Sequence, residues 1–486
     1  RLGMAASVRE RQIAALKRML DLNTNVNHSI ISEPVWKVLV YDRCGQDIIS
    51  PIFTIKELRD FGVTVHLQLH SDRDSIPDVP AIYFVMPTDD NIQRICQDFQ
   101  NGCYDSYYLN FISPISRQKL ENLGSAALNF NCVPQITKIY DQYLNFISLE
   151  DDLFTLRRSD DTLSFYEINR GDVKDTEMNA MLDGIVDCLF SVFVTLGTVP
   201  IIRCPRGNGA EMVAEKLDKK LKENLRDARN SLFTTDSFQS GQFSFQRPVL
   251  VILDRTTDLA TPLHHTWTYQ ALVHDVLDLH LNRVTLNEDE TDPLGQRVKR
   301  SSKTFDLMSS DKLWLTHKGS PFPTVAEVIQ EELEQYRSSE TEVKKLKTAM
   351  GLDGESDEAI SMLSDNTAKL TVAVSSLPEL LEKKRLLDMH TSIATAILNH
   401  IKQRKLDSYF EVEEKIMSKA ITDKSLMELI KNPYSGVPED KMRLFIIAFI
   451  CGQAMTDVEF DQYSAALQEA GCDLAALRYL KRWNGP

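Results

Sequence analysis

The sequence has none of the short motifs that identify common enzymes or metal sites. Its 486 residues include only 8 cysteines, and no two of them form a CxxC pair. A GxSxG, an HExxH and a Walker phosphate-binding sequence are also absent. No Cys/His cluster has zinc-ligand spacing, so we expect no metal and no cofactor. Most cysteines, such as Cys96 and Cys451, stand among apolar residues, which predicts buried, reduced thiols.

Long apolar runs and an excess of basic residues are missing as well. The most apolar stretches, residues 188–202 and 444–451, are shorter than the ~20 residues that cross a bilayer. The formal net charge is −15, which argues against a protein that grips nucleic-acid backbones. The N-terminal segment is a charged amphipathic helix pattern rather than a signal peptide. We therefore expect a cytoplasmic protein that binds no nucleic acid and meets membranes only through partners.

Residues 36–150 alternate strand and helix patterns, within a first α/β domain expected at 1–150. Such alternation predicts a parallel sheet covered by helices on both faces. The expected strands are 36–41, 63–69, 81–86 and 107–112, and the expected helices are 54–61, 89–99 and 116–128.

Residues 151–258 predict a second, smaller α/β domain. Helix patterns cover 185–196 and 211–225, and a strand is expected at 199–204. Residues 249–253 are five apolar residues in a row, which is typical of a strand buried on both faces.

From residue 259 to 486 the periodicity is largely helical. We expect a mobile surface loop at 287–310, whose RVKR sequence is a solvated feature, and an amphipathic helix or helix pair at 324–350. Pro378 suits a first helical residue, and 379–432 has no Gly or Pro. A helix of about 40 residues there would be roughly 60 Å long and would form a projecting hairpin that meets a helical partner. In the tail, Thr456 and Glu459 predict a capping box. Gly471 is expected to end that helix, and Asp473 is expected to start the next one.

Two aspartates follow predicted buried strands, where α/β sheets place ligands and acids. Asp42 and Asp254 could therefore serve a hydrolase or a nucleotide-binding enzyme. The alternative is that each caps its turn and pairs with the adjacent Arg43 or Arg255. Neither aspartate has a suitably spaced partner for acid–base or nucleophilic catalysis, so we expect no enzyme.

The turn at 205–210, PRGNGA, joins a strand to a helix and contains GxG. It could hold a phosphate, but without a third glycine or a GK[ST] it fits a tight turn that needs positive φ. His264 and His265 are adjacent and so cannot share a metal as an i, i+4 pair does. We expect one of them to be packed and the other exposed.

The segment 247–284 joins the strand at 249–253 to an apolar helix. Thr261 and Pro262 are expected to start that helix. We expect Asp254, Arg255 and Asp258 to form a charge network where the sheet domain meets the helical domain.

The same segment carries a family resemblance. Leu253-Asp254-Arg255, Asp258, Pro262-Leu263, His265 and the TYQA of 268–271 resemble the Sec/Munc-type (SM) family of syntaxin-binding proteins. The sequences of residues 258–275, 141–156 and 361–385 resemble the Sly branch of that family, which serves traffic between endoplasmic reticulum and Golgi.

The resemblance implies an arch of three domains, with boundaries near 150 and 258, and no catalysis. It also implies a factor for vesicle docking and membrane fusion that binds a syntaxin-type SNARE and templates the assembled SNARE complex. Tethering complexes are possible further partners. Such a protein would be peripherally associated with ER and Golgi membranes. SM chains usually continue beyond the position of Trp483, so we expect a C-terminally truncated chain whose second sheet lacks its returning strands and exposes an edge.

In the Sly branch a syntaxin N-terminal peptide inserts an aromatic side chain into a pocket between two helices of the first domain. The matching positions are Leu120, Leu123 and Gly124 on one helix and Ile136 and Ile139 on the next. The family more often has a small residue with a methyl group at the place of Gly124, so the pocket edge should be wider here. Ordinary core residues would have the same spacing. Leu123→Lys is expected to abolish binding by placing a charge in the pocket.

Overall fold

The computed structural model describes residues 6–23, 33–156, 164–227, 229, 232–233, 247–291, 297–349, 363–420 and 424–483. The chain divides into two compact units, Arg1–Thr257 (unit 1) and Asp258–Pro486 (unit 2). The boundary falls one residue from the predicted start of the helical domain. The further division of unit 1 near residue 150 stays a prediction.

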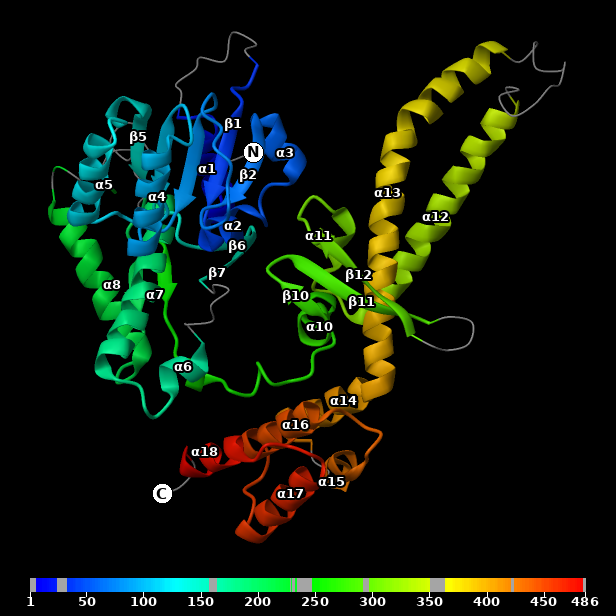
Figure 1. Cartoon of the computed structure of the whole chain (residues 1–486). Coiled ribbons are helices and arrows are strands. Elements are labelled where there is room, and N and C mark those ends of the chain that lie inside the picture. The colour runs from blue at the N-terminus through cyan, green and yellow to red at the C-terminus, as the bar shows by residue number, and fades with distance from the viewer. Residues whose placement is uncertain are drawn as a thin grey trace. The chain divides into compact units, whose positions relative to one another are not determined.

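Unit 1 is built on a five-stranded parallel sheet with the order β2-β1-β3-β4-β5. All five residues of β1 and of β3 are buried, because helices cover both faces (Figure 1). The four predicted strands are present, and a fifth follows them. The strands are β1 (Lys37–Tyr41), β2 (Val63–Gln68), β3 (Ala81–Val85), β4 (Tyr107–Phe111) and β5 (Ile136–Asp141).

Polar caps fix where the helices around this sheet begin. Ser7, Thr54, Thr88 and Ser116 each accept a hydrogen bond from a backbone N–H in the first turn of the helix that follows. These helices are α1 (Val8–Leu20), α3 (Ile55–Asp60), α4 (Asp89–Asn101) and α5 (Arg117–Asn129). A further helix, α2 (Arg43–Ile49), and a 3₁₀ turn, η1 (Val133–Gln135), complete this part of unit 1.

The rest of unit 1 has short strands and two long helices. A hairpin of β6 (Ile147–Glu150) and β7 (Leu153–Thr155) precedes α6 (Phe165–Asn169) and α7 (Asp175–Leu196). Two parallel strands, β8 (Ile201–Arg203) and β9 (Val249–Val251), flank α8 (Gly209–Arg226).

The prediction that β9 is buried on both faces is wrong. Val249 and Val251 are each 56% exposed. Leu250 packs against the apolar cluster of α7 and α8, so only one face is covered in the part of the chain that the structure describes. A continuous apolar run therefore predicts the strand but not its environment.

By length and composition α7 could cross a membrane, although the apolar stretch at residues 188–202 is by itself too short. Leu182, Val186, Phe190 and Phe193 of α7 belong to one core cluster with Leu217 of α8. These contacts are those of a helix that packs inside a folded domain.

Unit 2 begins with α10 (Tyr269–Val276) and a three-stranded antiparallel sheet of β10 (Asp278–His280), β11 (Arg283–Thr291) and β12 (Arg297–Asp306). The expected mobile loop at 287–310 is thus mostly strand. Its polar composition hid the pattern, although Leu286 and Phe305 contact the apolar core.

Long helices dominate the rest of unit 2. After α11 (Lys312–His317), α12 (Phe322–Ala349) and α13 (Leu363–Arg404) lie side by side as a hairpin (Figure 1). The predicted long helix exists, but Pro378 lies inside it rather than at its start. It ends at Arg404, because Lys405 adopts a φ of 52° before α14.

The bundle that follows has α14 (Leu406–Met417), α15 (Lys424–Lys431), α16 (Pro438–Cys451), α17 (Asp457–Glu469) and α18 (Ala475–Trp483). The predicted capping box of Thr456 and Glu459 is confirmed. Gly471 has a φ of 86°, and Asp473 accepts a hydrogen bond from Ala475 N, as expected for a helix end and the next start.

Candidate functional site

The five residues predicted to line a peptide pocket lie on a helix and a strand, not on two helices. Ile136 and Ile139 belong to β5, the edge strand of the five-stranded sheet. Ile136 pairs with Tyr107 and Ile139 with Leu109, because a register shift absorbs one residue between them. Tyr107 and Leu109 share a core cluster with Leu123 of α5. The bulge therefore puts both isoleucines on the sheet face that α5 covers.

The five predicted residues have unequal exposure. Leu123 is only 1% exposed and is a core residue. Leu120 and Ile139 are 40% and 38% exposed, and Ile136 is half-buried. A Cβ added at Gly124 would meet no atom within 4 Å. Leu120, Gly124 and Ile139 are accessible to a partner, whereas Leu123→Lys would disrupt the core before it tested any binding.

Three exposed apolar residues at the end of α5 and just after it were not found from the sequence. They are Leu128 at the end of α5, Phe130 and Val133. The missed signal was a set of large apolar side chains in the last turn of the helix and just after it. Together with Leu120, Gly124 and Ile139 they form what we call the α5/β5 surface.

Polar groups lie beside the start of α5. Lys119 Nζ donates to Pro87 O at 2.7 Å, and Arg117 pairs with Glu121 at 2.9 Å. Asp141, at the end of β5, accepts a hydrogen bond from Ile115 N at 3.0 Å. Burial raises the pKa of Asp141, although that hydrogen bond opposes the rise. These groups form a polar rim beside an apolar surface, as protein interfaces do.

Asp42 lies where the strand order reverses between β1 and β3, the usual ligand position in such sheets. Its carboxylate accepts hydrogen bonds from Gly45 N at 2.7 Å, Met86 N at 2.9 Å and Asn91 Nδ2 at 2.9 Å. Arg43 pairs with Asp47. Asp42 is thus a cap, as the alternative interpretation expected.

Asp254 also makes local hydrogen bonds. Its Oδ1 accepts from Thr256 N at 2.9 Å and Thr256 Oγ1 at 2.6 Å. The PRGNGA turn lies nearby, since a Cβ on Gly209 would be 3.4 Å from Asp254 Oδ2. Gly207 has the positive φ expected of a tight turn, at 78°, and Asn208 caps α8. Asp42 and Asp254 follow strands of different sheets, so the structure does not bring the proposed catalytic residues together.

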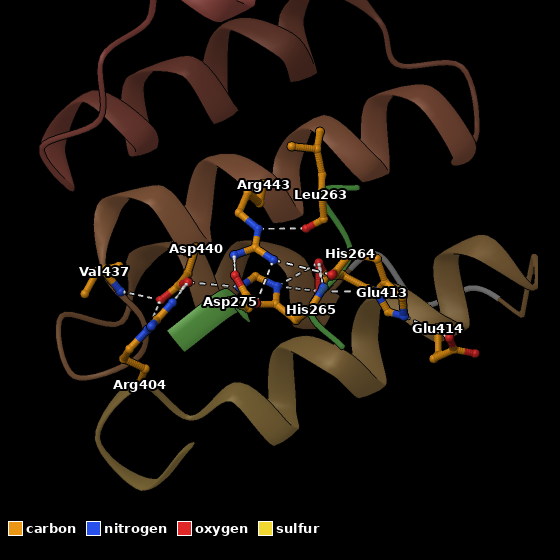
Figure 2. A network of polar contacts seen from close by, with 10 residues as sticks. All are labelled: Leu263, His264, His265, Asp275, Arg404, Glu413, Glu414, Val437, Asp440 and Arg443. Carbon is orange, nitrogen blue, oxygen red and sulfur yellow. Dashed lines mark hydrogen bonds and ion pairs between the residues drawn. The ribbon is translucent and has the colours of Figure 1, made fainter. Parts of the chain in front are cut away.

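The predicted helix start at Thr261 is wrong, because α10 begins at Tyr269 after Thr268. The charge network predicted at Asp254, Arg255 and Asp258 stays a prediction. Asp258 accepts from Ala260 N and from Thr261 N at 3.1 and 3.0 Å, which makes a local turn. A larger network of polar contacts lies inside unit 2 and is centred on His265 (Figure 2).

His265 is buried, as expected for one of the two adjacent histidines. Its Nδ1 lies 2.7 Å from Glu413 Oε2 and its Nε2 lies 2.9 Å from Asp440 Oδ1. Burial lowers the pKa of His265, but the hydrogen bonds with Asp440 and Glu413 more than offset this, and the pKa lies above 6.5. His264 keeps some exposure and contacts Glu414 at 2.9 Å.

Within the described ranges, no group of three or more His, Cys, Asp or Glu residues could hold a metal. The eight cysteines are thiols outside disulfides, but Cys96 and Cys451 are only half-buried, not buried as predicted. Burial raises the pKa of both thiols, which favours the protonated form.

Comparison with known proteins agrees with the resemblance seen in the sequence. The model of the Sec1 family matches residues 37–485. Mouse Sec1 family domain-containing protein 1 is 64% identical over 99% of this chain and 76% of its own length. The sly1 homolog of Drosophila melanogaster is 62% identical over 99% of this chain and 75% of its own length. The chain thus spans about three quarters of these relatives.

Solved structures share the fold. The crystal structure of Sly1p in complex with an N-terminal peptide of Sed5p is 31% identical, with a TM-score of 0.77 over 99% of this chain and 74% of that one. The SM protein Vps45 is 19% identical, with a TM-score of 0.73 over 97% of this chain and 76% of that one, which shows the fold alone. The α/β sheet unit, the helical unit and these matches lead to one conclusion: the chain belongs to the Sec1 family.

Proposed function

We propose that this protein binds a syntaxin-type SNARE of the early secretory pathway through that partner's N-terminal peptide, and is not an enzyme. The observation that carries the proposal is the accessible α5/β5 surface in a chain similar to Sly1p, which was solved with an N-terminal peptide of Sed5p. The strand-end aspartates are engaged in turns, so nothing in the described residues favours the hydrolase alternative over binding.

The α5/β5 surface suits an apolar or aromatic side chain of an extended peptide. Leu120 and Ile139 provide exposed apolar walls, and the open space above Gly124 lets a ring approach the helix backbone. Leu123 and Ile136 form the floor through the core that they share. A rigid floor with exposed walls needs little rearrangement on binding, which favours affinity.

The test is calorimetric titration of the protein with a syntaxin N-terminal peptide. Ile139→Lys should weaken binding by about 10- to 100-fold, because it replaces an apolar wall with a charge that the bound peptide would desolvate. Gly124→Phe should weaken binding similarly by filling the open space.

Ile55→Lys is the matched control. Ile55 is likewise an exposed isoleucine of unit 1, but it lies on α3, which packs beside β2 at the opposite end of the sheet from β5. The Ile55→Lys variant should bind the peptide with the same affinity as the unmodified protein. Equal affinity of Ile139→Lys and the unmodified protein would contradict the site.

The hairpin of α12 and α13 extends the proposal to the assembled SNARE complex. Its two helices present long surfaces to other helices, and SNARE motifs are themselves heptad helices. Templating of SNARE assembly on this hairpin would add to peptide binding on unit 1. The protein would then be cytoplasmic and peripherally associated with ER and Golgi membranes through its SNARE, with tethering complexes as possible further partners.

A further inference from the structure

The described residues of unit 2 form two separate apolar cores. One includes Tyr269, Trp314 and Ile397 and lies at the base of the α12/α13 hairpin, and we call it the hairpin core. The other includes Phe445 and Leu467 and joins α14 to α18, and we call it the bundle core. The contacts that tie the two cores together therefore differ from the apolar packing inside each core.

Polar groups carry much of that tie (Figure 2). Arg404, the last residue of α13, forms an ion pair with Asp440 of α16. Arg443 of α16 donates to Asp275 of α10 at 2.8 Å and to Leu263 O at 2.7 Å. The ring of Phe410, on α14, also stacks against His264 and Trp267, with centroids 5.4 and 5.5 Å away.

His265 is the one side chain in Figure 2 that joins α14 and α16 at once. Its two ring nitrogens face Glu413 Oε2 at 2.7 Å and Asp440 Oδ1 at 2.9 Å. A neutral imidazole has a single N–H donor, whereas the protonated ring has two. Both short contacts are hydrogen bonds only when the ring is protonated, because carboxylates are acceptors.

The two carboxylates differ in what remains if the proton leaves. Asp440 keeps its ion pair with Arg404 and the hydrogen bond from Val437 N at 2.9 Å. Glu413 is fully buried, and its other contacts with this segment are long, to His265 N at 3.3 Å and to His264 Nδ1 at 3.8 Å. The single N–H of the neutral ring therefore donates to Glu413, and the hydrogen bond between His265 and Asp440 is lost.

We propose that His265 is a protonation-dependent latch that holds the base of the α12/α13 hairpin on the α14–α18 bundle. With its proton, the ring ties the segment before α10 to both α14 and α16. Without it, α16 is released from His265 and the hairpin gains freedom relative to the bundle. The latch goes beyond the proposed SNARE binding and does not depend on it.

The sign of the pH dependence follows from the groups around the ring. Burial lowers the pKa of His265, Asp440 and Glu413 raise it, and Arg443 lowers it, with a net rise above 6.5. A raised folded-state pKa means that the stabilisation is complete below pH 6.5 and is lost as the pH rises through the folded pKa. Further charged or titratable groups of the neighbouring elements include His264, Asp275, His400, Arg404, Tyr409 and Glu414.

The experiment combines two measurements on the whole chain. The titration of His265 is followed by NMR with carbon-labelled histidine, its signal being the one that His265→Gln removes. The distance between spin labels carried by unnatural residues at Ser338 on α12 and Gln468 on α17 is measured over the same pH range. We expect His265 to titrate above pH 6.5 and the distance distribution to broaden with the same midpoint.

Variants sharpen the result. His265→Gln should give the broad distribution at every pH, whereas His280→Gln, an exposed histidine on β10, should keep the pH response of the unmodified protein. If His265→Gln fails to fold, the spin-label distance in the unmodified protein still decides, since a distribution that does not broaden as the pH rises above 6.5 overturns the latch. A His265 midpoint at or below 6.5, or a distance distribution that stays unchanged while His265 titrates, overturns the latch.

Discussion

Lys37 is a charged residue buried at the start of β1, an interior strand of the five-stranded sheet. Its Nζ donates to Leu20 O at 2.7 Å and to Phe61 O at 2.6 Å, so one amine caps the ends of both α1 and α3. Burial lowers the pKa of Lys37 to about 8, although Asp21 opposes the shift. The cost of burying the charge is tolerated because the amine satisfies two carbonyls that α1 and α3 leave unpaired.

Lys37→Met tests this arrangement through the pH dependence of stability. The folded-state pKa of about 8 lies below the usual 10.5, so the unfolded chain binds more protons between these values and stability rises with pH. The free energy of unfolding of the unmodified protein, relative to Lys37→Met, should therefore increase by about 3 kcal/mol from pH 8 to pH 10.5. Denaturant titrations at several pH values measure this difference, and a flat difference would refute the assignment.

At the scale of elements, a buried hydrogen-bond chain fixes three helices of the hairpin core. Tyr269 of α10 contacts His390 Nδ1 at 2.8 Å, and His390 Nε2 contacts Asp311 Oδ2 at 2.5 Å. Asp311 also caps α11. The Tyr269 hydroxyl donates to His390 Nδ1, so the His390 ring can donate its Nε2–H to Asp311. Each of these hydrogen bonds then has one donor and one acceptor.

Tyr269→Phe should destabilise unit 2 by about 1–3 kcal/mol, because it leaves a buried His390 nitrogen without a donor. Tyr434→Phe is the control, since Tyr434 lies exposed on a loop and its loss should change stability little. Thermal unfolding followed by aromatic fluorescence compares the two variants. Equal effects of both substitutions would show that the chain does not stabilise the hairpin core.

At the scale of the whole molecule, the α5/β5 surface and its supporting core lie entirely within unit 1. Residues 1–257, expressed alone, should bind the syntaxin N-terminal peptide with an affinity within about threefold of the full chain, since no residue of unit 2 belongs to that surface. Calorimetric titration of the fragment tests this, after circular dichroism has shown that it folds. A folded fragment that fails to bind would place part of the site in unit 2.

The sequence by itself determined most element positions and the family. Alternating apolar runs located four strands of the first sheet, and the Thr456–Glu459 capping box located α17, because both signals depend on neighbours close in the chain. The lack of catalytic partners near Asp42 favoured its role as a turn cap. Residues 253–271 carry the family resemblance, and the match to the Sec1 family confirms it.

Only the tertiary structure decided which residues are exposed and which distant groups meet. A register shift placed Ile136 and Ile139 of β5 on the same face of the sheet. Packing made Leu123 a core residue and left Leu120 accessible. The contact of His265 with Glu413 and Asp440 spans more than a hundred positions, so no local pattern could reveal it. Burial and long-range pairing depend on how elements pack, whereas capping and periodicity depend on a few consecutive residues.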